Sequence, residues 1–396
     1  MIDISSLVKA DLQTITPSMI RRINNRFSQI PNIVNLTIGE PDFPTPDHIK
    51  LAAVRSILNN HTHYAPNRGT ADLLAAISSY LASRFGLDYD PNTQIVVTNG
   101  ASEAISTVFN GIVGNGDRVL IAEPAFSLYK TLTVLNGAVP VTIDVSKTNF
   151  KLTPKVLKAS LEKYGQHLKL VVLNYPNNPT GVTYSENEVR ELANVLRHYP
   201  VAVLSDEVYS ELAYSGEHVS IARYLPEQTL LVNSVSKSYA MTGWRIGYLC
   251  GDPGIIRQLA KVHQAAVATV GTPNMDAATE AFLFGAPDSR HMKAVYPKRR
   301  DFLTRALTEI GFDFVPPQGA FYVYVHVPKF FKGNAMAFVE ELATKAGVAV
   351  VPGEAFMTGH SNYFRMSYAT SMANLDLTVS RLQAFVSHQF VEIERE

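Results

Sequence analysis

The sequence predicts an α/β protein with two domains. A chain of 396 residues is long for a single hydrophobic core, which favours a division into two. From residue 46 onward, helical patterns alternate with short apolar runs, as in proteins whose helices connect the strands of a parallel sheet. Two of these runs, 169–173 and 201–204, are apolar apart from Lys169 at the start of the first, which is typical of strands buried on both faces.

The composition is that of an ordinary globular enzyme, with 46% hydrophobic and 18% charged residues. Because 35 basic residues balance 35 acidic ones, no overall charge attracts the chain to nucleic acid or a membrane, and a small anionic substrate would need locally placed arginines. The single cysteine, Cys250, excludes an internal disulfide and a cysteine-based metal site. Since neither a signal-peptide pattern nor an apolar run of membrane-spanning length is present, we expect a soluble cytoplasmic protein.

The first 47 residues do not form a domain of their own in this interpretation. Residues 17–28 predict a helix and 33–38 an extended segment. Three prolines between residues 39 and 46 then exclude regular structure. Gly39 begins that segment, and a residue without a side chain allows another group to approach the backbone closely.

A possible anion site follows two predicted helices, over 47–59 and 71–85. The β-branched run 95–98 predicts a strand that leads through a glycine turn directly into another helix. This arrangement aims free backbone N–H groups at an anion. We therefore predict a phosphate site at Gly100, Ala101 and Ser102.

Functional side chains are expected at the ends of two further strands. Phe126 comes shortly after the strand 119–122, and Asp206 follows the strand 201–204. Ligands of open α/β sheets bind at the carboxyl ends of the strands, where an aromatic ring can stack on a ligand and a carboxylate can pair with a cationic group. Glu207 is an alternative to Asp206, but adjacent strand side chains point to opposite faces, so only one of the two can face a ligand.

The stretch around Lys237 carries the strongest chemical signal. An apolar run precedes residues 234–237, which are Ser-Val-Ser-Lys, and Arg245 follows the lysine. Desolvation or nearby cations would lower the pKa of Lys237 and free its lone pair for nucleophilic attack. Hydroxyl groups and a guanidinium suit a phosphate. Together these groups fit pyridoxal 5'-phosphate held on Lys237 as a Schiff base, and the alternative is a lysine in a serine-rich surface loop.

The last part of the chain predicts a long helix from about residue 289 and then an α+β region. The helix carries three consecutive basic residues, 298–300, which we interpret as a solvated face because the chain is neutral overall. In the apolar strand 363–369, Arg365 needs an anionic partner, which predicts either a structural salt bridge or an anionic ligand. The other elements expected here are strands over 319–325 and 348–351 and a helix over 335–346.

Residues 234–237, together with 241–247 (Met-Thr-Gly-Trp-Arg-Ile-Gly), resemble the lysine motif of class I and II aminotransferases, which are pyridoxal-phosphate enzymes of fold type I. Matching motifs occur near both ends of the chain, so the resemblance covers nearly all of it. It implies a large cofactor-binding domain over 48–288, with a mostly parallel seven-stranded sheet sandwiched by helices. A smaller α+β domain would comprise the N-terminal segment 1–47 together with the connecting helix and C-terminal part, 289–396.

The resemblance also implies a role at the cofactor for each candidate residue. Lys237 would carry pyridoxal 5'-phosphate and move the substrate proton, and Asp206 would keep the pyridine nitrogen protonated. Tyr209 and Asn178 would hydrogen-bond the phenolic oxygen, and Phe126 would stack on the ring. The phosphate would be held by Gly100, Ala101, Ser102, Ser234 and Arg245.

For the substrate, the resemblance implies that Arg365 binds the α-carboxylate in a forked geometry that lysine cannot supply. Asn178 would orient the same carboxylate, with the backbone N–H at Gly39 nearby. Tyr64 would reach across the interface of a homodimer to the cofactor phosphate of the other subunit.

These roles imply an aminotransferase with ping-pong kinetics that moves an amino group from an L-amino acid to a 2-oxo acid such as 2-oxoglutarate. Segments 173–183 and 206–212 resemble a bacterial subgroup of aromatic and N-acetyl-LL-2,6-diaminopimelate aminotransferases. Some aspartate-type relatives carry a lysine where this chain has Ser102, which argues against a dedicated aspartate enzyme. The alternatives are a carbon–sulfur β-lyase or related synthase on the same scaffold and a non-catalytic regulator, whereas the lack of a dinucleotide fingerprint argues against an oxidoreductase.

Overall fold

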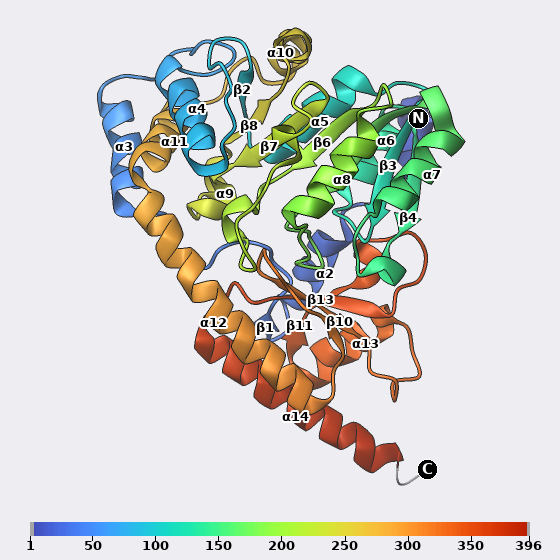
Figure 1. Cartoon of the computed structure of the whole chain (residues 1–396). Coiled ribbons are helices and arrows are strands. Elements are labelled where there is room, and N and C mark those ends of the chain that lie inside the picture. The colour runs from blue at the N-terminus through green and yellow to red at the C-terminus, as the bar shows by residue number, and fades with distance from the viewer. Residues whose placement is uncertain (1–3, 394–396) are drawn as a thin grey trace.

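In the computed structural model, which describes residues 4–393, helices cover both faces of a seven-stranded sheet, and a smaller four-stranded sheet lies next to it (Figure 1). The strands of the large sheet, in spatial order, are β2 (Ile95–Thr98), β8 (Gly247–Cys250), β7 (Thr229–Ser234), β6 (Ala202–Asp206), β5 (Leu168–Asn174), β3 (Arg118–Glu123) and β4 (Val139–Asp144). All neighbours are parallel except β8, which is antiparallel to both β2 and β7. The predicted α/β fold with a mostly parallel seven-stranded sheet is confirmed.

The central strands are buried on both faces because their side chains alternate between two helical layers. In β5, Leu170 and Val172 pack with side chains of α5 (Ala101–Ile112), α6 (Leu128–Leu135) and α10 (Pro253–Val267). Val171 and Leu173 pack on the other face, with α7 (Pro154–Tyr164) and α8 (Glu186–Leu196). A strand covered in this way is a continuous apolar run, which is why the sequence reveals it.

The remaining helices of this unit pack mainly near the β2 and β8 end of the sheet. They are α3 (Asp47–Leu58), α4 (Ala71–Phe85), α11 (Thr272–Phe284) and the single turn α9 (Val235–Ser238) directly after β7.

The smaller unit combines segments from both parts of the chain. Its antiparallel sheet has the order β12 (Val351–Pro352), β13 (Tyr363–Ser367), β10 (Tyr322–His326), β9 (Phe314–Val315). Nearby, β1 (Val34–Asn35) pairs in parallel with β11 (Val348–Ala349). The expected strand 348–351 is therefore two short strands with different partners. The helices of this unit are α13 (Ala335–Glu341), extended by a π-helical turn over Leu342–Ala346, and α14 (Met372–Ile393). Of the N-terminal helices, α2 (Met19–Phe27) packs into the core of this unit, whereas α1 (Ala10–Thr14) contacts α6 of the large unit.

The long helix α12 (Ala286–Ile310) leads from the large unit to the small one, where it lies alongside α14 (Figure 1). Its residue Arg299 is only 7% exposed and forks onto the carboxylate of Asp42 at 2.6 and 2.9 Å. The guanidinium also lies over the ring of Phe43, 5.3 Å from its centroid. The expectation of a solvated face at 298–300 is therefore wrong for Arg299, because the proline-containing segment covers that residue.

Within the described part of the chain, no helix combines the length and the apolar character needed to cross a membrane. The predicted domain boundaries at residues 48 and 289 stay predictions.

Candidate active site

The predicted site residues meet where the polypeptide leaves the carboxyl ends of β5, β6 and β7. A cavity of ≈ 240 Å³ lies there between the two units. The predicted residues that line it are Gly39, Ala101, Ser102, Phe126, Asn178, Asp206, Tyr209, Ser234, Lys237, Arg245 and Arg365. The parallel strands end at one edge of the sheet, so residues far apart in sequence converge there.

Lys237 lies in α9, whose start is capped by the Ser234 hydroxyl accepting from the backbone N–H of Ser236. Its Nζ donates to the carbonyl oxygen of Gly39 at 2.5 Å, and no carboxylate of the described residues forms an ion pair with it. Burial lowers the pKa of Lys237 to about 8. A substantial part of the amine is therefore neutral near physiological pH, as a nucleophile requires.

Asp206 ends β6 and is 4% exposed. One carboxylate oxygen accepts a hydrogen bond from the Tyr129 hydroxyl at 2.6 Å and the other accepts from the backbone N–H of Val208 at 3.3 Å. Burial raises the pKa of Asp206 to about 6, although the hydrogen bond from Tyr129 acts against this change. The carboxylate faces the cavity without a cation in contact, so it can pair with a cationic group of a ligand.

Glu207 is turned away from the cavity. Its carboxylate accepts from Ser205 at 2.7 Å and from Ser220 at 2.6 Å, and it contacts the His218 ring nitrogen at 2.8 Å. The geometry therefore favours Asp206 as the residue that meets a ligand.

Arg365 is 2% exposed and has no carboxylate partner among residues 4–393. Its two Nη atoms donate to the side-chain oxygen of Asn178 at 2.8 Å and to the carbonyl oxygen of Thr37 at 2.6 Å, and its Nε has no partner. Its guanidinium is sandwiched between the rings of Tyr322, at 4.3 Å, and Phe356, at 4.9 Å. A buried cation without an internal anion does not fit the structural salt bridge, and favours an anionic ligand.

A second anion-binding corner lies at the start of α5. Gly100 caps this helix with φ +77°, and a Cβ there would collide with the guanidinium of Arg245. Gly247 on β8 likewise leaves room for the backbone of Ala101. Gly100 itself does not line the cavity, whereas Ala101 and Ser102 of the first helical turn line it together with Arg245.

Tyr64 is not part of this cavity. It is 91% exposed and lines a separate surface hollow with residues such as His63 and Thr269. Its predicted role involves a second chain, so its position in one chain leaves that role a prediction.

Several lining residues were not predicted. One is Tyr129, three residues after Phe126, whose hydroxyl donates to the carboxylate of Asp206. Another is Asn174, whose side-chain oxygen accepts from the backbone N–H of Asn178 at 3.0 Å. Tyr322 lies in a segment that the sequence only identified as a strand. Its position two residues from the strand partner of Arg365 could have indicated it, once the pairing of the strands was known.

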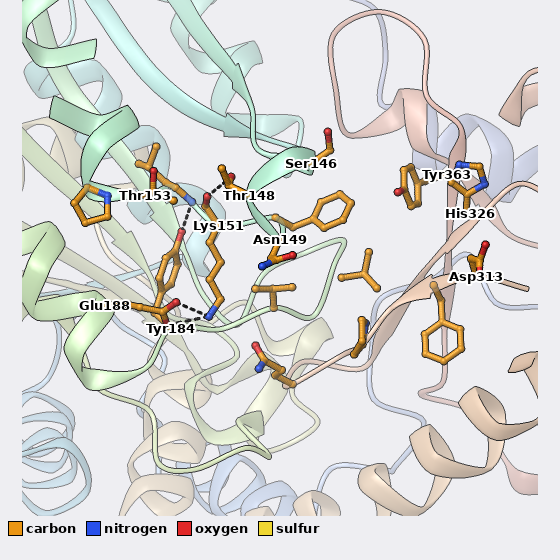
Figure 2. Close-up of a pocket in the computed structure, with 18 residues that line it drawn as sticks. Ser146, Thr148, Asn149, Lys151, Thr153, Tyr184, Glu188, Asp313, His326 and Tyr363 are labelled. Carbon is orange, nitrogen blue, oxygen red and sulfur yellow. Dashed lines mark hydrogen bonds and ion pairs between the residues drawn. The ribbon is translucent and has the colours of Figure 1, made fainter. Parts of the chain in front are cut away.

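A larger cavity of ≈ 800 Å³ lies elsewhere between the units (Figure 2). Lys151, Tyr184 and Glu188 line one side of it and His326 and Tyr363 the opposite side. Lys151 is already paired with Glu188 at 2.8 Å, and the Tyr184 hydroxyl accepts from the backbone N–H of Leu152. None of the predicted site residues lines this cavity, so we place the chemistry in the smaller one.

Comparisons with known proteins agree with this geometry. Residues 31–382 match the family model described as aminotransferase class I and II. A probable N-acetyl-LL-diaminopimelate aminotransferase of Bacillus subtilis (strain 168) is 41% identical over 380 residues, which cover 96% of each chain.

Solved structures are similar over almost the whole chain. An aspartate aminotransferase from Thermus thermophilus with maleate has a TM-score of 0.90 at 33% identity and covers 95% of this chain and 99% of its own. An aromatic aminotransferase from Pyrococcus horikoshii OT3 has a TM-score of 0.86 at 32% identity, covering 92% and 99%.

Proposed function

The chain belongs to the class I and II aminotransferases, and from that premise we propose that it moves the amino group of an aromatic L-amino acid, or of N-acetyl-LL-2,6-diaminopimelate, to a 2-oxo acid such as 2-oxoglutarate. Enzymes of this family depend on pyridoxal 5'-phosphate. When bound, this cofactor supplies an aldehyde that takes up the amino group and a ring that accepts the electrons of the broken Cα–H bond.

The residues around the cavity fit that cofactor. The amine of Lys237 has no competing carboxylate, and the first turn of α5 together with Arg245 offers a phosphate site. Asp206 is buried with its charge uncompensated, which suits a protonated pyridine nitrogen. Phe126 lines the same space and supplies an aromatic face.

The observation that carries the proposal is the buried guanidinium of Arg365, which shares the cavity with Lys237 and lacks an internal anion. A substrate α-carboxylate is the partner that Arg365 needs. Arg365 already donates to the side-chain oxygen of Asn178 at 2.8 Å, so Asn178 lies next to the same carboxylate position. With the carboxylate held there, the amino group and Cα of the substrate lie within the cavity beside Lys237. The Nζ of Lys237 then moves the proton that leaves substrate Cα, acting first as a base and then as an acid.

The role of Arg365 is tested by Arg365→Lys, which keeps the charge and removes the fork. We expect kcat/KM for the amino donor to fall by about a hundredfold, mostly through KM. Borohydride should still fix the cofactor to Lys237. Arg84→Lys is the matched control, because Arg84 is paired with Glu211 away from the cavity. An Arg365→Lys enzyme with an unchanged KM would contradict the assignment.

The choice of donor rests on the cations of the cavity. Lys237, Arg245 and Arg365 are its only basic lining residues in the described chain, and each already has a proposed partner. Ser102 supplies no further positive charge for a second carboxylate, which favours an aromatic donor over aspartate, and a longer substrate such as 2-oxoglutarate or N-acetyl-LL-2,6-diaminopimelate would need a partner for its second carboxylate outside this lining. Aromatic amino acids, N-acetyl-LL-2,6-diaminopimelate and aspartate should be compared as donors with 2-oxoglutarate. A clear preference for aspartate would overturn this part of the proposal and leave the family assignment intact.

We also propose a homodimer in which Tyr64 completes the site of the partner. Apolar side chains on α3 and α11 are exposed in the single chain, among them Leu58, Leu283 and Phe284. Their burial by a second copy would remove apolar surface from water. The cytoplasmic location stays a prediction.

A further inference from the structure

Tyr322 joins the two halves of the proposed site and has not been given a role so far. It begins β10, is 1% exposed, and lines the cavity. Its strand partner on β13 is Ser367, so Tyr322 and Arg365 are diagonal neighbours on one face of the small sheet. At that spacing, an aromatic ring and a long side chain reach each other.

Three groups meet at this side chain. Its ring covers the guanidinium of Arg365 at 4.3 Å, and its hydroxyl oxygen lies 2.7 Å from that of Tyr209. The same hydroxyl occupies the space that a Cβ at Gly39 would need. Tyr322 therefore touches the proposed carboxylate-binding arginine, the proposed partner of the cofactor's phenolic oxygen, and the backbone beside Lys237.

The direction of the hydrogen bond between the two hydroxyls matters. In the part of the chain that the structure covers, each hydroxyl has only the other as a side-chain partner. If Tyr209 donated to Tyr322, it could not donate to a ligand, because a phenol has one hydrogen. If Tyr322 donates, the hydrogen of Tyr209 is left for the cavity.

The charge of Arg365 favours the second arrangement. A cation over an aromatic face withdraws electron density from the ring and makes its hydroxyl a better donor. The positive charge of Arg365 acts to lower the pKa of both Tyr322 and Tyr209, and burial has the larger effect and raises both, but of the two rings only that of Tyr322 has the guanidinium over it. The other charged groups around this pair are Asp206, which lines the same cavity, and Lys237, 6.0 Å from the centroid of the Tyr209 ring.

We propose that Tyr322 is a positioning residue that couples the occupancy of Arg365 by a carboxylate to the hydrogen bond that Tyr209 offers the cofactor. The inference rests on the proposed function of this cavity. A bound carboxylate neutralises the guanidinium, so the Tyr322 hydroxyl becomes a weaker donor to Tyr209. The hydrogen bond that Tyr209 offers to the phenolic oxygen of the cofactor then changes in strength. This changes the proton affinity of the Lys237 nitrogen that holds the cofactor.

The test uses the cofactor-loaded enzyme and its visible absorption as a function of pH. Succinate, a carboxylate without an amino or oxo group, serves as the probe of Arg365. In the unmodified protein, succinate should shift the pH midpoint of the absorbance change. In Tyr322→Phe, which loses only the hydroxyl, the shift should fall to about half or less, because the contact through Asn178 remains.

Two further variants separate this coupling from a structural role. Tyr322→Leu also removes the ring over Arg365 and should raise the KM of the amino donor by about tenfold, whereas Tyr322→Phe should change that KM less than about twofold. Tyr324→Phe is the matched control, since Tyr324 lies on the same strand face and its hydroxyl is directed at Ser361, 3.4 Å away. It should behave as the unmodified protein does.

Tyr209→Phe provides a second route, because it removes the other hydroxyl of the pair. It should reduce the succinate-induced shift as much as Tyr322→Phe, and the double variant should reduce it no further. A Tyr322→Phe enzyme with the full shift overturns the coupling. If the unmodified protein neither binds the cofactor at Lys237 nor transfers amino groups, the proposed function itself fails, and the two failures are thereby distinguished.

Discussion

The hydroxyl of Tyr129 donates to the carboxylate of Asp206 across 2.6 Å, in a place where both side chains are buried. Among residues 4–393, this is the single hydrogen bond that another side chain donates to the Asp206 carboxylate. Without a bound cation, the carboxylate is therefore an unfavourable charge that the fold keeps at the ligand's position.

Replacing Asp206 by asparagine should stabilise the cofactor-free protein. The pKa of Asp206 is raised from 3.8 to about 6 in the folded state, so its ionisation opposes folding. As pH rises from about 4 to 6, Asp206 loses its proton more readily in the unfolded chain than in the folded one, so the free energy of unfolding falls. Above that range the loss is about 3 kcal/mol, which corresponds to about two pKa units. Thermal unfolding of the cofactor-free proteins at pH 5 and 8 should show a larger advantage for the variant at pH 8.

Glu207→Gln is the neighbouring control and should have the opposite effect. Its carboxylate accepts from two serine hydroxyls and contacts His218, and an amide cannot replace all of these contacts. If Asp206→Asn also lowered the unfolding temperature at pH 8, the interpretation of Asp206 as an uncompensated charge would be wrong.

The rate at which cofactor attaches to the cofactor-free protein should increase with pH and level off above about 8. Only the neutral amine attacks the aldehyde, and the pKa of Lys237 is lowered to about 8. Between pH 7 and 9 the neutral fraction, and with it the rate, should rise about tenfold. Stopped-flow absorbance after mixing measures this rate. A rate that keeps rising steeply toward pH 10.5, the ordinary pKa of a lysine, would refute the prediction, and Lys237→Ala should show no cofactor fixed by borohydride.

The ion pair between Arg299 and Asp42 should matter for substrate binding although neither residue lines the cavity. It fixes the segment that follows Gly39, whose carbonyl oxygen accepts from Lys237. Arg299→Lys cannot fork onto Asp42, and we expect stability to fall by about 1–3 kcal/mol and the donor KM to rise. Urea unfolding and steady-state kinetics test both effects.

Arg300→Lys is the control for this prediction, because Arg300 pairs with its exposed neighbour Asp301. Equal effects of the two substitutions would show that the contact with Asp42 has no special importance.

Mixing two inactive variants should restore activity if Tyr64 acts across a dimer interface. In a hybrid of Tyr64→Ala and Lys237→Ala subunits, one of the two sites has both residues intact. After random exchange of subunits, activity should reach about a quarter of that of the unmodified enzyme. Phe126→Ala mixed with Lys237→Ala should stay inactive, since both residues line the cavity of one chain. No recovery in the first mixture would contradict a shared site.

The strands that could be predicted are those covered on both faces. β5 and β6 each contain a continuous apolar run. β5 extends one residue beyond each end of its predicted strand, and β6 begins one residue later and ends two residues later than predicted. β4 was missed because it is the edge strand and Val139 is exposed, so its pattern is mixed. The division of 348–351 into β11 and β12 depends on which distant strand each half meets, which no local pattern contains.

The same distinction applies to the site. Residues at strand ends, such as Asp206, are predictable because topology places them at one edge. The burial of Arg299 depends on Asp42, which is far away in the sequence. The run of basic residues on the helix therefore predicted a solvent-exposed side chain where the structure has a buried one. Tyr322 resembled an ordinary core residue because its contact with Arg365 depends on how β10 and β13 pair, and its contact with Tyr209 arises only when the two units meet.

The position of β8 has a consequence for the order in which the protein is made. β2 pairs only with β8 in the large sheet, so Thr98 cannot pair with Gly247 until β8 has been synthesised and has left the ribosome. Until then, the apolar strand Ile95–Thr98 and the helix start that follows it have no partner on that side. We therefore expect the nascent chain to present this segment to molecular chaperones until translation has passed Cys250.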